Sequence, residues 1–421
     1  MKVVHCSTSV NSSSANTRIH KALLKQGINS WILTMYNNTD NVSNVLETTE
    51  YGIKFSMMRR FLYYVNIAEC FFLDKICKLT KGMPYTWAFI GNDLYKTTMI
   101  KSADIIHIHC VNSGYLSLRQ IKHIVQLEKP VVITLHDSWF LTGGCHVLAG
   151  CDDYKNGCKK CMKIEKCRNI TRNRCRIKRN ILKSSNVYFT APSKWTYNNY
   201  LKSGLPEKRC LVIGNTLDYD VFKANMDKKN TDGRVNLLFG AINSTETPYK
   251  GFKYLIAMLK LLYDTLPDLA DKIDLHIFGS NGSDEEILKK YNCKFEGYIE
   301  NEREMARLYS MSDIYIVPSL EDSFNQTVLE SCACETPVVS FRTGGISDII
   351  VHKCTGYLAE YKDTEDLLKG VRWILRNNNN NCIGKSARNY VKQIFSEKKI
   401  SSQYIGIYNS LYYSRHSRES G

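Results

Sequence analysis

The sequence lacks any run of 18 uncharged apolar residues, so we expect no helix that crosses a membrane. Residues 1–7 read as a strand and residues 9–15 as the polar loop after it, without the long apolar core of a secretory signal. Sixteen cysteines without an export signal indicate reduced thiols. These features predict a cytoplasmic protein.

Signatures for several ligands are also missing. The nearest candidate for a Rossmann glycine fingerprint, residues 240–251, has the wrong spacing, and no nucleic-acid-binding module is recognisable. The chain nevertheless carries 57 Lys and Arg against 41 Asp and Glu, a net charge of +16, which favours acidic partners. With nucleic acid excluded, anionic lipid headgroups and diphosphates are the expected partners.

At 421 residues the chain is long enough for two domains of about 200 residues each. Residues 104–110 (DIIHIHC) and 130–136 (PVVITLH) are typical of buried parallel strands, and both runs carry histidines at or next to their ends. Ligands bind at the carboxyl edge of open parallel sheets. His136 is therefore a candidate functional residue, and His109 and Asn112 are weaker candidates.

The most informative segment is 310–345. It predicts a strand at 313–318, a helix capped by Ser323, a second strand at 338–341 and a Gly-Gly turn. A helix start presents unpaired amides and a partial positive charge, which suits a phosphate. Three consecutive backbone amides are candidates for holding it: Asn325, Gln326 and Thr327.

Two acids flank that helix start. Asp322 precedes the helix and is expected on the sugar side of a bound phosphate, and Glu330 lies about two turns inside, on the nucleoside side. A carboxylate at the second position can accept hydrogen bonds from both ribose hydroxyls. A plain α/β crossover with solvent-facing acids is the alternative interpretation.

The same segment resembles the nucleotide-sugar signature of retaining glycosyltransferases of family 4, also called group 1. The matching elements are Asp322, Glu330, the helical run SCAC, the strand starting Pro337-Val338-Val339, and the turn Gly344-Gly345. The chain departs from the family where Asp322 replaces glutamate and where Asn325 and Glu335 replace glycine. Residues 134–151 (TLHDSWFLTGGCHVLAGC) are similar to a subgroup that builds exopolysaccharide and lipopolysaccharide, colanic-acid-type transferases among them.

The resemblance implies two Rossmann-like α/β domains facing each other across a cleft. It assigns an acceptor-binding domain to 1–220, a nucleotide-sugar-binding domain to 221–395, and a helix at 396–421 that crosses back onto the first domain. Lys250 then holds the donor diphosphate, assisted by Asn243 because Ala241 stands where the family has arginine. The resemblance makes two residues catalytic, both next to the donor sugar: His136 and Asp322.

The implied reaction transfers a sugar, with retention, from a nucleoside diphosphate sugar to a lipid-linked glycan. It belongs to bacterial surface polysaccharide synthesis, whether lipopolysaccharide O-antigen, capsule or exopolysaccharide, at the inner face of the cell membrane. No Asp-x-Asp metal motif is present in a suitable loop, so we expect no catalytic cofactor. Two alternatives stay open, a non-catalytic sugar-nucleotide-binding partner and a nucleotide-sugar 2-epimerase on the same architecture.

Two segments are predicted to contact an anionic membrane surface. Residues 57–81 mix aromatic and aliphatic side chains with basic ones, namely Arg59, Arg60, Lys75, Lys78 and Lys81. Residues 155–183 carry twelve Lys or Arg and one acid, Glu165. The alternatives are an ordinary buried helix pair for the first segment and a solvated helix face for the second.

A cysteine cluster follows the second predicted strand. It comprises Cys145, Cys151, Cys158 and Cys161, and its last pair has the Cys-x-x-Cys spacing of a zinc knuckle. Four thiolates could hold a structural zinc ion. Competing ligands are His146, Cys167 and Cys175. Free thiols, or disulfides formed in air, are the alternatives.

Overall fold

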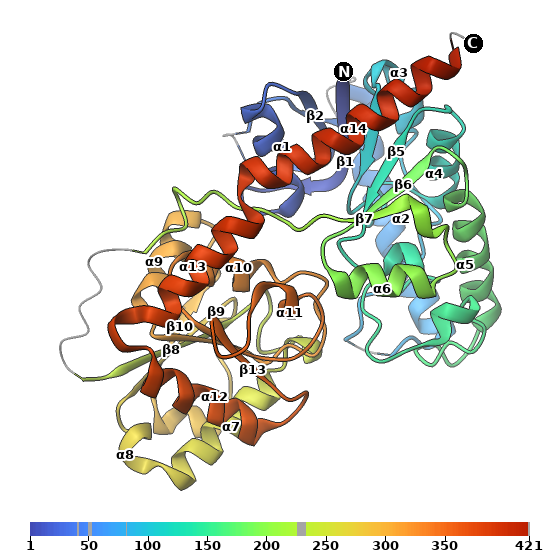
Figure 1. The fold of residues 1–421 in the computed structure, drawn as a ribbon. Coiled ribbons are helices and arrows are strands. Elements are labelled where there is room, and N and C mark those ends of the chain that lie inside the picture. The colour runs from blue at the N-terminus through green and yellow to red at the C-terminus, as the bar shows by residue number, and fades with distance from the viewer. Residues whose placement is uncertain (40–41, 49–52, 81, 225–232, 420–421) are drawn as a thin grey trace. The chain divides into compact units, whose positions relative to one another are not determined.

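The computed structural model describes residues 1–39, 42–48, 53–80, 82–224 and 233–419. The chain divides into two compact units, one made of Met1–Thr216 with Glu397–Gly421 and the other of Leu217–Ser396. Each unit contains one parallel β-sheet flanked by helices (Figure 1). The predicted fold class, two parallel α/β domains, is confirmed.

The first unit has a seven-stranded sheet in the order β3-β2-β1-β4-β5-β6-β7. Its strands are β1 (Lys2–Val10), β2 (Asn29–Asn37), β3 (Val45–Glu47), β4 (Ile105–Ile108), β5 (Val131–Thr134), β6 (Val187–Ala191) and β7 (Cys210–Val212). Its helices are α1 (Ala15–Lys25), α2 (Ile53–Cys77), α3 (Thr98–Ser102), α4 (Leu118–Val125), α5 (Arg168–Leu182), α6 (Lys194–Lys202) and α14 (Glu397–Glu419). The central strands β4 and β5 are buried along their whole length, as near-continuous apolar runs require.

The second unit has a six-stranded sheet in the order β10-β9-β8-β11-β12-β13. Its strands are β8 (Val235–Gly240), β9 (Ile273–Phe278), β10 (Asn292–Gly297), β11 (Ile314–Val317), β12 (Val338–Phe341) and β13 (Gly356–Ala359). Its helices are α7 (Phe252–Thr265), α8 (Pro267–Ala270), α9 (Glu302–Met311), α10 (Gln326–Ala333), α11 (Ile346–Ile349), α12 (Thr364–Asn377) and α13 (Cys382–Phe395). Among the described helices of both units, none combines the length and apolarity needed to cross a membrane.

The C-terminal helix α14 belongs to the first unit, where it packs beside α1 (Figure 1). Tyr404 and Tyr408 are fully buried, and the Tyr408 hydroxyl lies 2.7 Å from Nδ1 of His107 in β4. The predicted return of the last helix to the first domain is confirmed. The backbone becomes extended at Ser396 (ψ 147°), which separates α13 from α14.

The first strand is longer than predicted. β1 continues past Ser7 because Ser9 and Val10 still pair with Tyr36 and Asn37 of β2. The polar loop expected from residue 9 therefore starts at Asn11. Residues 53–77 form the single helix α2 in place of the helix pair that was one interpretation of this segment.

Candidate functional site

Charged side chains meet beyond the carboxyl ends of β8 and β11 in the second unit. Lys250 ends a 3-10 turn after β8, and Asp322 lies in the loop after β11. The Lys250 ammonium and the Asn325 amide each donate to the same Asp322 oxygen over 3.1 Å. Burial lowers the pKa of Lys250, but the attraction of Asp322 prevails and raises it, so the ammonium stays charged.

Two glycines let these loops approach the backbone beside them. Gly251 has φ +81°, and a Cβ there would lie 1.8 Å from the carbonyl oxygen of Pro318. Gly344 has φ +53°, and its Cβ would lie 2.1 Å from the carbonyl oxygen of Asp322, which accepts the Gly345 N–H over 2.9 Å. Only glycine fits at both positions, so the ion pair depends on them.

Helix α10 is capped by Asn325, and the prediction that Ser323 caps it is wrong. The Asn325 side-chain oxygen accepts the amide N–H of Val328 over 2.9 Å. The loop continues past Ser323 because the Asp322 carboxylate accepts the amide N–H of Phe324 over 3.3 Å. The predicted phosphate-binding residues thus lie at the helix start, with Asn325 as the cap and the next two residues in the first turn.

Two further residues predicted to bind the donor, Thr327 and Asn243, contact other side chains of the second unit. The Thr327 hydroxyl donates to Asn325 over 2.7 Å and accepts from the Tyr315 hydroxyl over 2.9 Å, so this side chain is held within the unit. Asn243 is exposed, and its side-chain oxygen accepts from the Tyr298 hydroxyl over 2.6 Å. Among the described contacts none joins Asn243 to Lys250.

Glu330 lies inside α10 and is 5% exposed. Its carboxylate accepts a hydrogen bond from the Tyr309 hydroxyl over 3.1 Å. The Asp322 side chain is 18% exposed. Both acids are therefore largely buried, and the alternative of solvent-facing acids is wrong.

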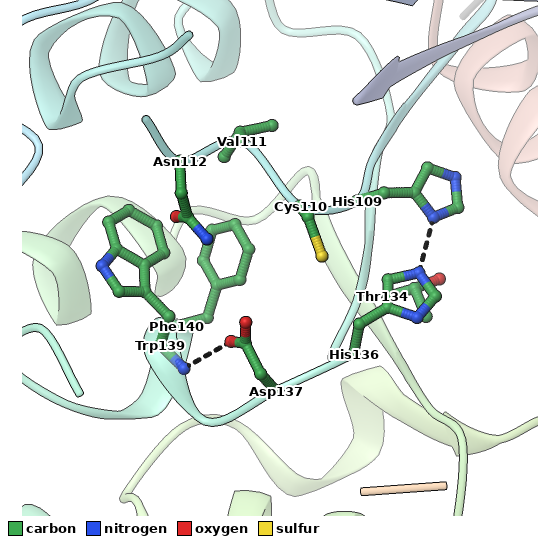
Figure 2. A pocket seen from close by; sticks show the side chains of 9 residues that line it. All are labelled: His109, Cys110, Val111, Asn112, Thr134, His136, Asp137, Trp139 and Phe140. Atoms are coloured by element: carbon green, nitrogen blue, oxygen red, sulfur yellow. Dashed lines mark hydrogen bonds between the residues drawn. The ribbon is translucent and has the colours of Figure 1, made fainter. Parts of the chain in front are cut away.

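In the first unit, residues from the carboxyl ends of β4 and β5 line a pocket (Figure 2). His136 lies two residues beyond β5, with its Nε2 atom 2.9 Å from Nδ1 of His109. Asn112, from the loop after β4, lines the same pocket. The structure therefore brings the three predicted residues together. Burial lowers the pKa of His136 to about 4, so its ring is neutral at pH 7.

The pocket also contains Asp137, which the sequence interpretation did not assign to the site. The Asp137 carboxylate lies 2.8 Å from Nδ1 of His146. It also accepts the Trp139 amide N–H over 2.8 Å (Figure 2). Burial alone would raise the pKa of Asp137, but these partners lower it and keep the carboxylate ionised. The sequence did contain one indication of this role for Asp137, which is its position next to His136 at the end of a strand.

The cysteine cluster lines one small cavity with Lys163. The four predicted ligands are all present there: Cys145, Cys151, Cys158 and Cys161. A hydrogen bond with Cys145 lowers the pKa of Cys161 to about 6, although burial opposes this. Cys158 is hydrogen-bonded to Cys175 of α5, and in the described part of the chain no three of the cluster's sulfurs lie within 4.8 Å of one another.

His146, one of the competing zinc ligands, is engaged elsewhere. Its Nδ1 atom contacts Asp137, and its Nε2 atom lies 2.8 Å from the Thr86 hydroxyl. Because both ring nitrogens already have partners, His146 is not available to the cysteine cavity.

The basic segment 155–183 is divided between interior and surface. Lys163, Arg174 and Lys178 are buried, and each donates to backbone carbonyl oxygens of the surrounding loops. Lys178 also lies 3.6 Å from the ring centroid of Trp139. The basic side chains that remain exposed are Lys159, Lys160, Lys166, Arg168, Arg172, Arg176 and Lys183.

Known proteins resemble this chain in sequence. Residues 228–394 match the family described as glycosyl transferases group 1. The chain is 24% identical over 280 residues to an Escherichia coli K12 protein whose name assigns it to colanic acid biosynthesis as glycosyl transferase WcaC; the match spans 62% of this chain and 65% of that relative. It is 21% identical over 334 residues to a 41.2 kDa protein in the cps region of Klebsiella pneumoniae. This match spans 75% of this chain and 82% of that relative.

Solved structures resemble it in fold. HepE of Anabaena, in complex with UDP and glucose, superposes with a TM-score of 0.65 at 14% identity, over 97% of this chain and 100% of that one. WaaG, a glycosyltransferase involved in lipopolysaccharide biosynthesis, superposes with a TM-score of 0.60 at 13% identity, over 96% of this chain and 99% of that one. At these identities the likeness establishes a shared fold.

Proposed function

Residues 228–394 of this chain match the family of group 1 glycosyl transferases, in agreement with the resemblance found in the sequence, and from this premise we propose that the protein transfers a sugar from a nucleoside diphosphate sugar to a lipid-linked glycan. The proposed role is in bacterial surface polysaccharide synthesis, as lipopolysaccharide O-antigen, capsule or exopolysaccharide. The names of the relatives in the colanic acid and cps systems support this role. The proposed location is cytoplasmic, peripheral on the inner face of the membrane.

The observation that carries the proposal is the grouping of Lys250, Asp322 and the start of α10 at one edge of the sheet. A partly buried ammonium beside a helix N-terminus offers a point charge and backbone donors, which together suit a diphosphate. Asp322 holds Lys250 in place before the ligand arrives, and its carboxylate is left to bind a sugar hydroxyl. The presence of UDP in the HepE structure supports this choice of ligand.

Glu330 is proposed to bind the ribose. Its carboxylate is buried within α10, where hydrogen bonds are stronger than in water. The Tyr309 hydroxyl orients the carboxylate by donating to Oε2. A carboxylate held in this way can accept both ribose hydroxyls of a nucleoside.

Transfer is proposed to proceed with retention and without a metal ion. No covalent nucleophile is assigned, and the leaving diphosphate itself accepts the proton of the attacking hydroxyl on the same face. The protein then contributes positioning and charge stabilisation, through Lys250 and the α10 amides on the diphosphate and Asp322 and His136 on the sugar. Lys250 and the helix dipole take the place of a divalent metal.

A panel of nucleoside diphosphate sugars, screened by thermal shift, identifies the donor. Donor turnover and the anomeric configuration of the product, measured by NMR, then test the reaction. Transfer with retention is expected. Donor binding without transfer or hydrolysis would favour the non-catalytic partner, which the departures at Ala241, Asp322 and Asn325 suggest. Inversion at C2 of the donor sugar would instead identify a 2-epimerase.

Membrane association is proposed through α2. Its described outer face exposes Tyr64, Ile67, Phe71, Phe72 and Ile76, with the Phe71 and Phe72 side chains 62% and 61% exposed. The Lys75 ammonium lies 5.9 Å from the Phe71 ring, so cationic and aromatic groups share this face, which suits anionic headgroups over an acyl boundary. The side chains of Arg59 and Arg60, and Lys81, lie outside the described residues.

Flotation with vesicles tests this surface. Binding is expected to increase with anionic lipid and to decrease in high salt. Replacing Phe71 and Phe72 with serine should weaken it, whereas the matched control Ile242→Ser, at a residue 78% exposed in the second unit, should not. Equal binding to neutral and anionic vesicles would contradict the proposal.

A structural zinc ion at the cysteine cavity is the remaining proposal. The four thiols line the same cavity, and the lowered pKa of Cys161 favours a thiolate there. Cys158 must leave Cys175 for the four sulfurs to converge on one ion. Elemental analysis of protein purified without chelator is expected to give about one zinc per chain. Less than about a tenth of a zinc per chain, with all thiols titratable, would exclude the site.

A further inference from the structure

A chain of three histidines runs from the interior of the first sheet to the pocket in Figure 2. Nδ1 of His5, in β1, lies 2.8 Å from Nε2 of His109, and Nδ1 of His109 lies 2.9 Å from Nε2 of His136. His5 and His109 are buried, with 0% and 1% exposed, whereas His136 lines the pocket. Burial is the main cause that lowers the pKa of all three, so each ring is neutral at pH 7.

A neutral imidazole carries one N–H, so only two proton arrangements satisfy both contacts. In the first, every ring carries its proton on Nδ1, and the hydrogen bonds run from His5 to His109 to His136. In the second, every ring carries its proton on Nε2, and the bonds run in the opposite direction. The second arrangement places an N–H on Nε2 of His5, a buried atom that has no partner in the described part of the chain.

The buried end of the chain favours the first arrangement. A buried N–H donor without a partner is rare in folded proteins and unfavourable, whereas an acceptor without a partner is tolerated more often. At the other end His136 is only half-buried, and water or a ligand can pair with either form of its Nδ1 atom. The two ends together select Nδ1–H on all three rings.

We propose that His5 and His109 are positioning residues that hold His136 as its Nδ1–H tautomer, so that His136 offers the pocket a hydrogen-bond donor and not a basic nitrogen. The consequence for catalysis rests on the proposed transferase function. A donor N–H suits an oxygen of the sugar or of the leaving diphosphate. It does not remove the proton of the attacking hydroxyl on the glycan acceptor, so the leaving diphosphate takes up that proton.

The same cluster is poorly arranged for a metal ion, although ring nitrogens of His5, His107 and His109 lie within 4.8 Å of one another. His107 is engaged at both nitrogens, with the Tyr408 and Thr134 hydroxyls each 2.7 Å away. His109 is likewise engaged at both nitrogens. Of the ring nitrogens of these three histidines, only Nε2 of His5 is without a partner in the described residues, and one nitrogen does not make a metal site.

Ring ¹H–¹⁵N correlation spectra of the full chain labelled with ¹⁵N-histidine test the tautomer directly. The spectrum of His136→Gln identifies the signals of His136 by their loss. The wild-type ring is expected to show a protonated Nδ1 and a bare Nε2 at pH 7.5, without donor or acceptor present. A bare Nδ1, or a mixture of the two forms, would overturn the proposal. This measurement stands whether or not the chain proves to be a transferase.

Two variants of His5 separate positioning from packing. Asn can place its amide nitrogen near the position of the histidine Nδ1 atom, so His5→Asn should keep the Nδ1–H tautomer of His136, whereas His5→Leu should lose it. In the transfer assay His5→Leu should lower kcat about tenfold with the donor KM little changed, and His5→Asn should restore most of it. Unchanged His136 signals in a folded His5→Leu protein would refute the inference. It would also be refuted if the wild-type protein held a stoichiometric metal ion that the His5→Leu variant lacked.

Discussion

Gly344 gives the most direct test of the site in the second unit, because the substitution Gly344→Ala adds one methyl group beside Asp322. That methyl carbon would start 2.1 Å from the Asp322 carbonyl oxygen and 3.0 Å from the Asp322 nitrogen, at a residue with φ +53°. Left-handed backbone costs a non-glycine residue about 1–2 kcal/mol. The overlap is with backbone, which no rotamer change relieves, and overpacking costs a further 1–3 kcal/mol or so.

The expected loss is therefore about 2–5 kcal/mol, or at least about 4 °C in the unfolding temperature of a unit of this size. Relief of the overlap must also move the Asp322 loop by about 1 Å, and an error of that size in a catalytic group can lower the rate by about a hundredfold. We therefore expect Gly344→Ala to fold but to lose transfer activity and affinity for the nucleoside diphosphate together, because Lys250 is held by the same carboxylate.

Differential scanning calorimetry and isothermal titration with the nucleoside diphosphate of the donor that the thermal-shift panel identifies measure the two effects. Gly282→Ala is the matched control, because a Cβ at Gly282 meets nothing within 4 Å and its φ is not positive. The control should stay within about 0.5 kcal/mol of wild type. A Gly344→Ala protein with wild-type melting and wild-type turnover would show that the Asp322 loop does not depend on this turn.

Three further outcomes are expected. Lys250→Ala should weaken binding of the nucleoside diphosphate far more than binding of the nucleoside, and equal losses in calorimetric titrations would show that Lys250 does not contact the diphosphate. Glu330→Gln should weaken both ligands by about 1.5–3 kcal/mol through the ribose, and unchanged affinity would contradict that contact. Burial lowers the pKa of His20 to about 4 against 6.5 in the unfolded chain, so its contribution to stability is complete above pH 6.5 and is lost as pH falls toward 4, by up to about 1.4 kcal/mol per pH unit. Urea unfolding from pH 7 to 4.5 should show a loss of stability to which the other buried histidines also contribute. In His20→Gln the slope of that loss should be smaller by up to about 1.4 kcal/mol per pH unit, and an identical slope in that variant would assign the loss to other groups.

The sequence by itself determined the strand–loop–helix unit around Asp322. Residues 313–345 contain a short apolar strand, turn residues and a capped helix, and these depend on contacts between residues near in sequence. The cap itself was predicted two residues early. Ser323 and Asn325 both have suitable side chains, and only the contact of Asp322 with the Phe324 amide decides between them.

The tertiary structure decided which polar groups face one another. His5, His109 and His136 come from three different strands or strand ends, and the sheet order β1-β4-β5 makes them neighbours. The sequence placed His109 and His136 at the ends of their strands, but it did not show which rings touch and did not single out His5. In the same way, Lys163 and Lys178 are ordinary members of a basic run, and only the folded loops give their ammonium groups buried carbonyl oxygens to bind. Side-chain partners distant in sequence depend on packing, and periodicity along the chain carries no information about them.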